Sequence, residues 1–67
     1  MWTVVYISPN KISAEQIKGI LTGEGLLVML RAIGIPHFGD SSAVEVLVPE
    51  IEAEEALEII NNSFIPV

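Results

Sequence analysis

Alternating apolar and polar residues predict two adjacent strands in the middle of the chain. Residues 26–33 and residues 43–48 are rich in aliphatic side chains that fall alternately on two sides of an extended backbone. A first strand is expected at residues 2–7, where nearly every side chain is β-branched or aromatic. Because residues 2–7 show little polar alternation, we expect this strand to be central in its sheet or covered on both faces.

The charges within the two middle strands predict how these strands pair. An antiparallel register that places Arg31 opposite Glu45 puts both charges on the outer face of the sheet. The same register brings Leu30 opposite Val46 on the inner face. A shift of one residue would bury a charge, so we predict the pairs Arg31–Glu45 and Leu30–Val46.

Two segments carry apolar side chains at helical spacing. The first spans about residues 11–24, with Asn10 as the predicted N-cap and Gly25 as the left-handed residue that ends the helix. A capping box that begins at Ser13 is the alternative start. The second helix is expected at residues 50–62. The apolar stripes of the two helices consist of Ala14, Ile17, Ile20 and Leu21, and of Ala53, Ala56, Leu57 and Ile60.

The order of these elements predicts an α+β fold. Two amphipathic helices can cover one face of an antiparallel sheet, and the compact solution is a ferredoxin-like β-α-β-β-α(-β) two-layer sandwich. In this arrangement the first strand lies beside the third and the second lies at an edge. A fourth strand formed by the apolar tail, residues 64–67, would lie outside the first. We expect residues 1–67 to form this one domain.

With both helices on one side, the other face of the sheet is expected to be uncovered and largely apolar. A domain of 67 residues is marginal alone, because it buries only about 60% of the surface of its unfolded chain. Large apolar patches usually mark an interface, so we predict a homo-oligomer; the alternative is that Trp2 or the tail shields this face. The predicted interface consists of Leu27, Met29, Arg31, Ile33, Glu45 and Leu47, with Ala43 and half of the first strand beside them.

Composition excludes several classes of function. The chain has no Cys and one His, which excludes disulfides, thiolate metal sites and a His-rich zinc site within one chain. Nine Asp and Glu residues against three Lys and Arg residues argue against binding to nucleic acid or to an anionic membrane surface. No apolar run approaches the about 20 residues of a membrane span, and the N-terminus lacks the features of a signal peptide. A cytoplasmic protein is therefore the expectation.

The segment between the two middle strands, residues 34–42, holds the single His and several polar side chains. Hairpin loops are usually shorter, and long ordered loops are often functional. His37, Asp40 and Ser41 or Ser42 are the residue types of a nucleophilic triad. A triad converges from separate elements over a pocket, whereas these residues share one short turn, so we predict no catalytic site.

Two other interpretations of this loop stay open. The backbone amides and hydroxyl groups of residues 39–42 suit an anion or another small polar ligand. Purely structural roles also account for the residues, since Gly34 and Gly39 permit turns and Asp40 and Ser41 satisfy backbone amides. The predicted loop for a ligand or a protein partner consists of His37, Phe38, Gly39, Asp40, Ser41 and Ser42.

A run of glutamates in the second predicted helix raises the question of a metal site. Glu54, Glu55 and Glu58 are neighbours on one helix surface. Such a run is most often a solvated face, because each carboxylate retains its own hydration. We therefore predict neither a metal nor another cofactor.

Motifs spread over nearly the whole chain resemble those of one protein family. They are Trp2–Tyr6, Ala14–Lys18, Glu24–Leu26, Val46–Glu50 and Glu54–Leu57, with Gly34–His37 as in a subgroup. The chain is similar in these motifs to short bacterial proteins described as prokaryotic signal-transducing proteins, a domain of unknown function. The resemblance implies a ferredoxin-like core, distantly similar to the nitrogen-regulatory PII proteins, and a role in signal transduction.

Two activities connected with this resemblance find no support in the residues. The chain has neither the long effector loop of PII proteins nor a nucleotide-binding motif. Some similar short chains carry the label glutamate decarboxylase, an activity that needs pyridoxal phosphate on a Lys in a deep pocket. Lys11 and Lys18 lie on or near an exposed helix face, and the chain is too short to enclose that cofactor. The expected function is a non-enzymatic regulatory or interaction module, with ligand sensing through residues 34–42 as the alternative.

Overall fold

The computed structural model describes residues 1–33 and 43–63, which form three strands and two α-helices. The elements follow the predicted order. They are β1 (Trp2–Ser8), α1 (Lys11–Gly23), β2 (Met29–Ala32), β3 (Val44–Pro49) and α2 (Ala53–Ser63), with a 3-10 turn, η2 (Glu50–Glu52), directly before α2.

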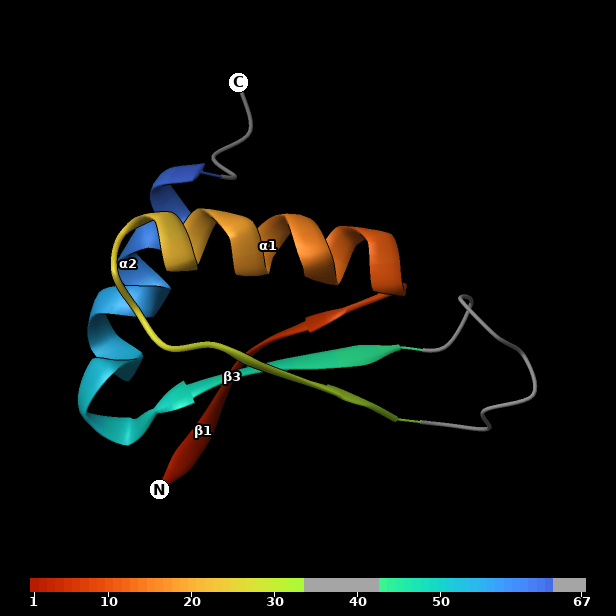
Figure 1. Ribbon diagram of the computed structural model, residues 1–67, viewed down its shortest axis with the longest axis horizontal. Coiled ribbons are helices and arrows are strands. Elements are labelled where there is room, and N and C mark those ends of the chain that lie inside the picture. Colours follow the sequence, from red (N-terminus) through yellow and green to blue (C-terminus); the bar gives the residue numbers. More distant parts are fainter. Residues whose placement is uncertain (34–42, 64–67) are drawn as a thin grey trace.

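The three strands form one antiparallel sheet in the order β1-β3-β2. Among these strands β1 lies beside β3 and β2 lies at an edge, as predicted. Both helices lie on the same side of the sheet (Figure 1), so the described residues form a two-layer α+β arrangement. The fourth strand proposed for residues 64–67 falls outside the described residues.

The predicted pairing of the two middle strands is confirmed. Arg31 pairs with Glu45, and Leu30 pairs with Val46. Nη2 of Arg31 lies 2.7 Å from Oε1 of Glu45, and Nε of Arg31 donates a hydrogen bond of 2.7 Å to the same oxygen. The strand β2 begins only at Met29, three residues later than predicted.

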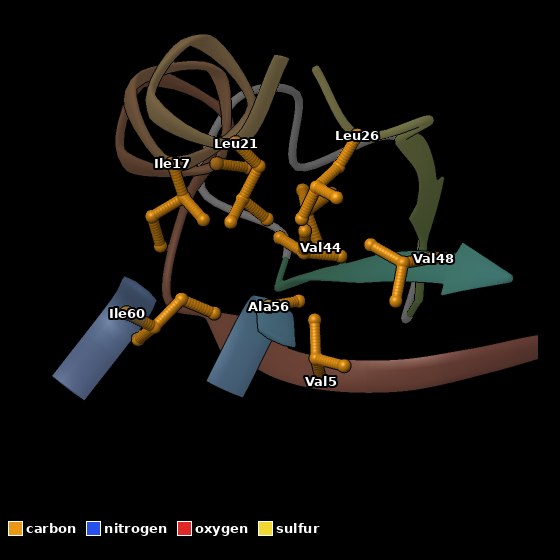
Figure 2. Close-up of a cluster of buried hydrophobic side chains, with 10 residues drawn as sticks. Val5, Ile17, Leu21, Leu26, Val44, Val48, Ala56 and Ile60 are labelled. Carbon is orange, nitrogen blue, oxygen red and sulfur yellow. The ribbon is translucent and has the colours of Figure 1, made fainter. Parts of the chain in front are cut away.

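The hydrophobic core lies between the sheet and the helices. Figure 2 shows Ile17 and Leu21 of α1 above Val44, with Leu26 beside Leu21 and with Ala56 of α2 next to Val5. Full burial of one such aliphatic side chain contributes about 1.5–3 kcal/mol. The buried hydrophobic residues of this cluster are Val5, Ala14, Ile17, Leu21, Leu26, Val44, Val46, Val48, Ala56 and Ile60.

The two ends of α1 follow from local sequence. The Asn10 side-chain oxygen accepts a hydrogen bond of 2.8 Å from the backbone N–H of Ser13, so Asn10 is the N-cap and the alternative start at Ser13 is wrong. At the other end Gly25 has a φ of 91°. The N–H of Leu26 donates to the carbonyl of Leu21 at 3.2 Å, which is the long hydrogen bond of a Schellman motif.

The predictions for the second helix need two corrections. The α-helix begins at Ala53, because Glu50–Glu52 form a 3-10 turn instead of its first turn. Leu57, predicted in the buried stripe, is 47% exposed, whereas Ile59 packs against the core. Helical spacing places Ala56 near the centre of the buried face, but only the neighbouring elements decide which flank is covered.

Candidate interaction surface

The side of the sheet turned away from the helices carries mainly apolar residues. In β3, Glu45 and Leu47 alternate with the core residues, so their side chains lie on the side away from the helices. Residues that pair with Glu45 and Leu47 on β1 and β2 lie on this same side. We call this surface the open face. It consists of Trp2, Val4, Ile7, Leu27, Met29, Arg31, Glu45, Leu47 and Pro49.

The open face is ordered in three rows that cross the strands. The middle row is Val4–Leu47–Met29 and is wholly apolar. One outer row is Ile7–Glu45–Arg31 and contains the ion pair. The other outer row begins with Trp2–Pro49. Leu27, which precedes β2, continues this row. Its neighbours Leu26 and Val28 pack toward the core, so Leu27 is on the opposite side.

Several large apolar side chains of this face contact solvent. The exposed fractions are 43% for Trp2, 38% for Val4, 57% for Ile7 and 64% for Leu27. Leu47, at the centre of the face, is only 2% exposed, because Val4 and Met29 flank it on the two neighbouring strands. The face is therefore mainly apolar, with the buried Leu47 at its centre.

A β-bulge in β1 decides which residues of this strand lie on the open face. Val4 pairs with Leu47 while Tyr6 already pairs with Val46, so the register shifts at Val5. Val5 packs into the core. Because of this extra residue, even-numbered residues face outward before the bulge and Ile7 faces outward after it. The first strand was expected to be central in its sheet or covered on both faces. Among the described strands β1 lies at an edge, and one of its sides is exposed.

Charge is distributed unevenly between the two layers. The net charge is −6, yet Glu45 is the one acidic residue that the described part of the chain places on the open face, and it is paired with Arg31. The open face is therefore neutral overall. The other acidic residues of the described segments belong to the helices or their ends and are Glu15, Glu24, Glu50, Glu52, Glu54, Glu55 and Glu58.

A cavity of about 270 Å³ lies on the helix side of the sheet, between the first turns of α1 and the adjoining ends of β2 and β3. It has an apolar floor with one cationic and one anionic side chain at its rim, and both charged side chains are exposed. It lies near the two strand ends to which residues 34–42 connect. Its lining residues are Lys11, Glu15, Leu30, Ala32 and Val44.

Most of the predicted interface residues meet on the open face. Met29, Arg31, Glu45 and Leu47 form adjoining parts of two rows, while Ile33 follows β2 and is half-buried. For the first strand, the prediction was that half of its residues lie on this face, without saying which. The bulge in β1 determines which residues these are. The predicted ligand or partner loop, His37, Phe38, Gly39, Asp40, Ser41 and Ser42, lies outside the described residues.

The described segments contain neither a cluster of metal-ligating side chains nor a membrane-spanning helix. In residues 1–33 and 43–63, no group of three or more His, Cys, Asp or Glu side chains is placed to hold a metal ion, and Glu54, Glu55 and Glu58 form no such group. Neither α1 nor α2 has the length and apolar character needed to cross a membrane.

Comparison of the chain with protein-family models, with curated proteins and with solved structures finds no match. Within the described residues, the open face and the cavity are the features that bear on function.

Proposed function

We propose that this protein is a non-enzymatic regulatory or protein-interaction module that associates with further copies of itself through the open face. The observation that carries this proposal is the exposure of Trp2, Val4, Ile7 and Leu27 on one side of the sheet. An apolar patch of this kind usually marks an interface. Association also removes apolar surface from water that a small domain cannot bury alone.

The distribution of charge favours a second copy as the occupant. Two copies that approach through their helix layers bring like charges together, because these layers carry most of the acidic residues. Two copies that approach through their open faces meet neutral surfaces, since Arg31 offsets Glu45. The open face is thus the surface on which self-association meets the least electrostatic repulsion.

A ferredoxin-like fold belongs to the same proposal. The strand order β1-β3-β2 and the placement of both helices on one face support it. A strand formed by residues 64–67 outside β1 would complete that fold. The resemblance to prokaryotic signal-transducing proteins fits a regulatory role.

The proposal is tested by native mass spectrometry of the untagged protein together with Ile7→Glu. We expect the wild type to form dimers or larger assemblies, and Ile7→Glu to weaken association about tenfold or more, because a carboxylate would be buried in the interface. Ile12→Glu is the matched control, because Ile12 is 67% exposed on α1. A wild type that stays monomeric at all concentrations, or equal effects of both variants, would show that the open face is not the interface.

The cavity favours a second candidate function, the sensing of a small polar ligand. One cation and one anion above an apolar floor could hold a small charged molecule with an apolar part. The test is a thermal shift assay with inorganic phosphate and free amino acids as probes. A shift that vanishes in Lys11→Ala, or when Asp40 and Ser41 are replaced by Ala, supports sensing, and no shift with any probe counts against it.

A further inference from the structure

We infer that the second copy packs face to face about a two-fold axis that runs across the strands at Leu47, an arrangement that rests on the proposed function of the open face. Each residue of the middle row then meets the same residue of the second copy. The two outer rows exchange, so that the Ile7–Glu45–Arg31 row of one copy faces the Trp2 row of the other.

The symmetry of a face-to-face dimer limits the possible directions of its two-fold axis. An interface with two-fold symmetry uses the same patch on both copies, and for two packed sheets the axis lies between them, parallel to the sheet planes. With an axis along β3, each residue of β3 faces the same residue of the second copy. The strand β1 of one copy then faces β2 of the other. An axis across the strands instead places each strand on itself in the opposite direction.

Charge discriminates between these two arrangements. With the axis along β3, the carboxylate of Glu45 faces Glu45 of the second copy, although this side chain is only 16% exposed already in one chain. Closing that contact would press the two carboxylates against each other, while each Arg31, although paired with Glu45 in its own chain, would face Ile7 of the other copy. With the axis across the strands, Glu45 faces Pro49 of the second copy. Arg31, whose side chain is 59% exposed, stays at the border of the face and keeps its ion pair within its own chain.

The same arrangement covers exposed apolar residues of the open face. Ile7 faces Trp2 of the second copy, and these side chains are 57% and 43% exposed in one chain. Val4 and Met29 meet their own counterparts on either side of Leu47. Packed sheets lie about 10 Å apart, which is the distance that two layers of such side chains fill.

Single-cysteine variants test this arrangement, because the chain contains no native Cys. Each variant is treated with a short bismaleimide, and covalent dimers are quantified by denaturing gel and mass spectrometry. We expect Val4→Cys and Met29→Cys each to crosslink to themselves. Ile7→Cys should crosslink to Trp2→Cys in an equimolar mixture and not to itself. Ile12→Cys on α1 is the matched control and should give only background dimer.

The outcomes separate the arrangement from the proposed function. If mixed Val4→Cys and Met29→Cys crosslink while neither does so alone, the axis runs along β3, and the inferred arrangement is overturned although the open face remains the interface. Assemblies that form in native mass spectrometry without any of these crosslinks overturn it as well. A wild type that is monomeric throughout instead removes the proposed function itself. Circular dichroism of each variant verifies that it is folded before crosslinking.

Discussion

Individual residues determine where the elements of this protein begin and end. Asn10 caps α1, and Gly25 adopts the left-handed conformation after it. Ser8, which is fully buried, donates a hydrogen bond of 2.8 Å from its hydroxyl to the carbonyl of Asn10. The turn from β1 into α1 is thus held by polar contacts between near neighbours in sequence, which is why a sequence pattern locates it well.

Two glycine substitutions should have opposite effects on stability. Gly25→Ala should lower the free energy of unfolding by about 1 kcal/mol, because a φ of 91° is unfavourable for a residue with a Cβ. Gly19→Ala should raise it by up to about 1 kcal/mol, because this helical position has open space around an added Cβ. Urea denaturation measures both, and a Gly25→Ala variant that is as stable as the wild type or more stable would contradict the proposed role of Gly25.

Replacement of the N-cap should destabilise α1. Asn10→Ala removes the acceptor of the 2.8 Å hydrogen bond from Ser13 and should cost about 1 kcal/mol of stability. Asn62→Ala, at the exposed end of α2, serves as the control and should change stability by less than half as much. Indistinguishable urea midpoints for the two variants would argue against the cap.

Among the elements, the strand β3 contributes to both the hydrophobic core and the open face. One side of this strand supplies core residues, and the other side supplies the middle of the open face. A contact between distant segments supports this arrangement, because Oε1 of Glu52 accepts a hydrogen bond of 3.1 Å from the N–H of Leu27. This contact ties the segment before β2 to the turn before α2, and no local sequence pattern predicts it.

The buried face of α2 can be tested by a pair of truncations. Ile60→Ala should cost about 2–5 kcal/mol, because this side chain is 7% exposed and its loss leaves a cavity in the core. Leu57→Ala should cost clearly less, since Leu57 is 47% exposed. Thermal or urea unfolding of both variants gives the comparison. A loss for Leu57→Ala as large as that for Ile60→Ala would mean that the flank of α2 at Leu57 is buried as well.

In the whole molecule, the helix layer is acidic and the open face of the sheet is neutral. This difference in charge influences self-association. The net charge of −6 makes two copies repel each other at long range, while the apolar rows attract only on contact. Dissolved salt screens the repulsion over a Debye length of about 10 Å at 0.1 M ionic strength. Self-association is therefore expected to respond to ionic strength.

Added salt should strengthen self-association through the open face. Raising sodium chloride from low concentration to about 0.5 M should lower the dissociation constant severalfold, because it reduces repulsion between acidic chains and leaves apolar contacts intact. Sedimentation velocity at several salt concentrations measures this change. A dissociation constant that rises with salt would indicate that opposite charges hold the copies together.

Local sequence patterns correctly predicted the order of the elements, the cap and end of α1, and the pairing of Arg31 with Glu45. These features depend on local backbone preferences and on keeping charge out of the core, and both are encoded within short segments. The sequence also predicted that the open face would carry Met29 and Leu47.

The individual residues of β1 that complete that face depend instead on contacts between strands. The bulge at Val5 places Ile7 outward, and a shift of one residue cannot be recognised in a strand that is apolar on both sides. The covered flank of α2 and the shielding of Leu47 likewise depend on neighbours that are distant in sequence. Burial is a property of the assembled layers, whereas periodicity belongs to each segment alone.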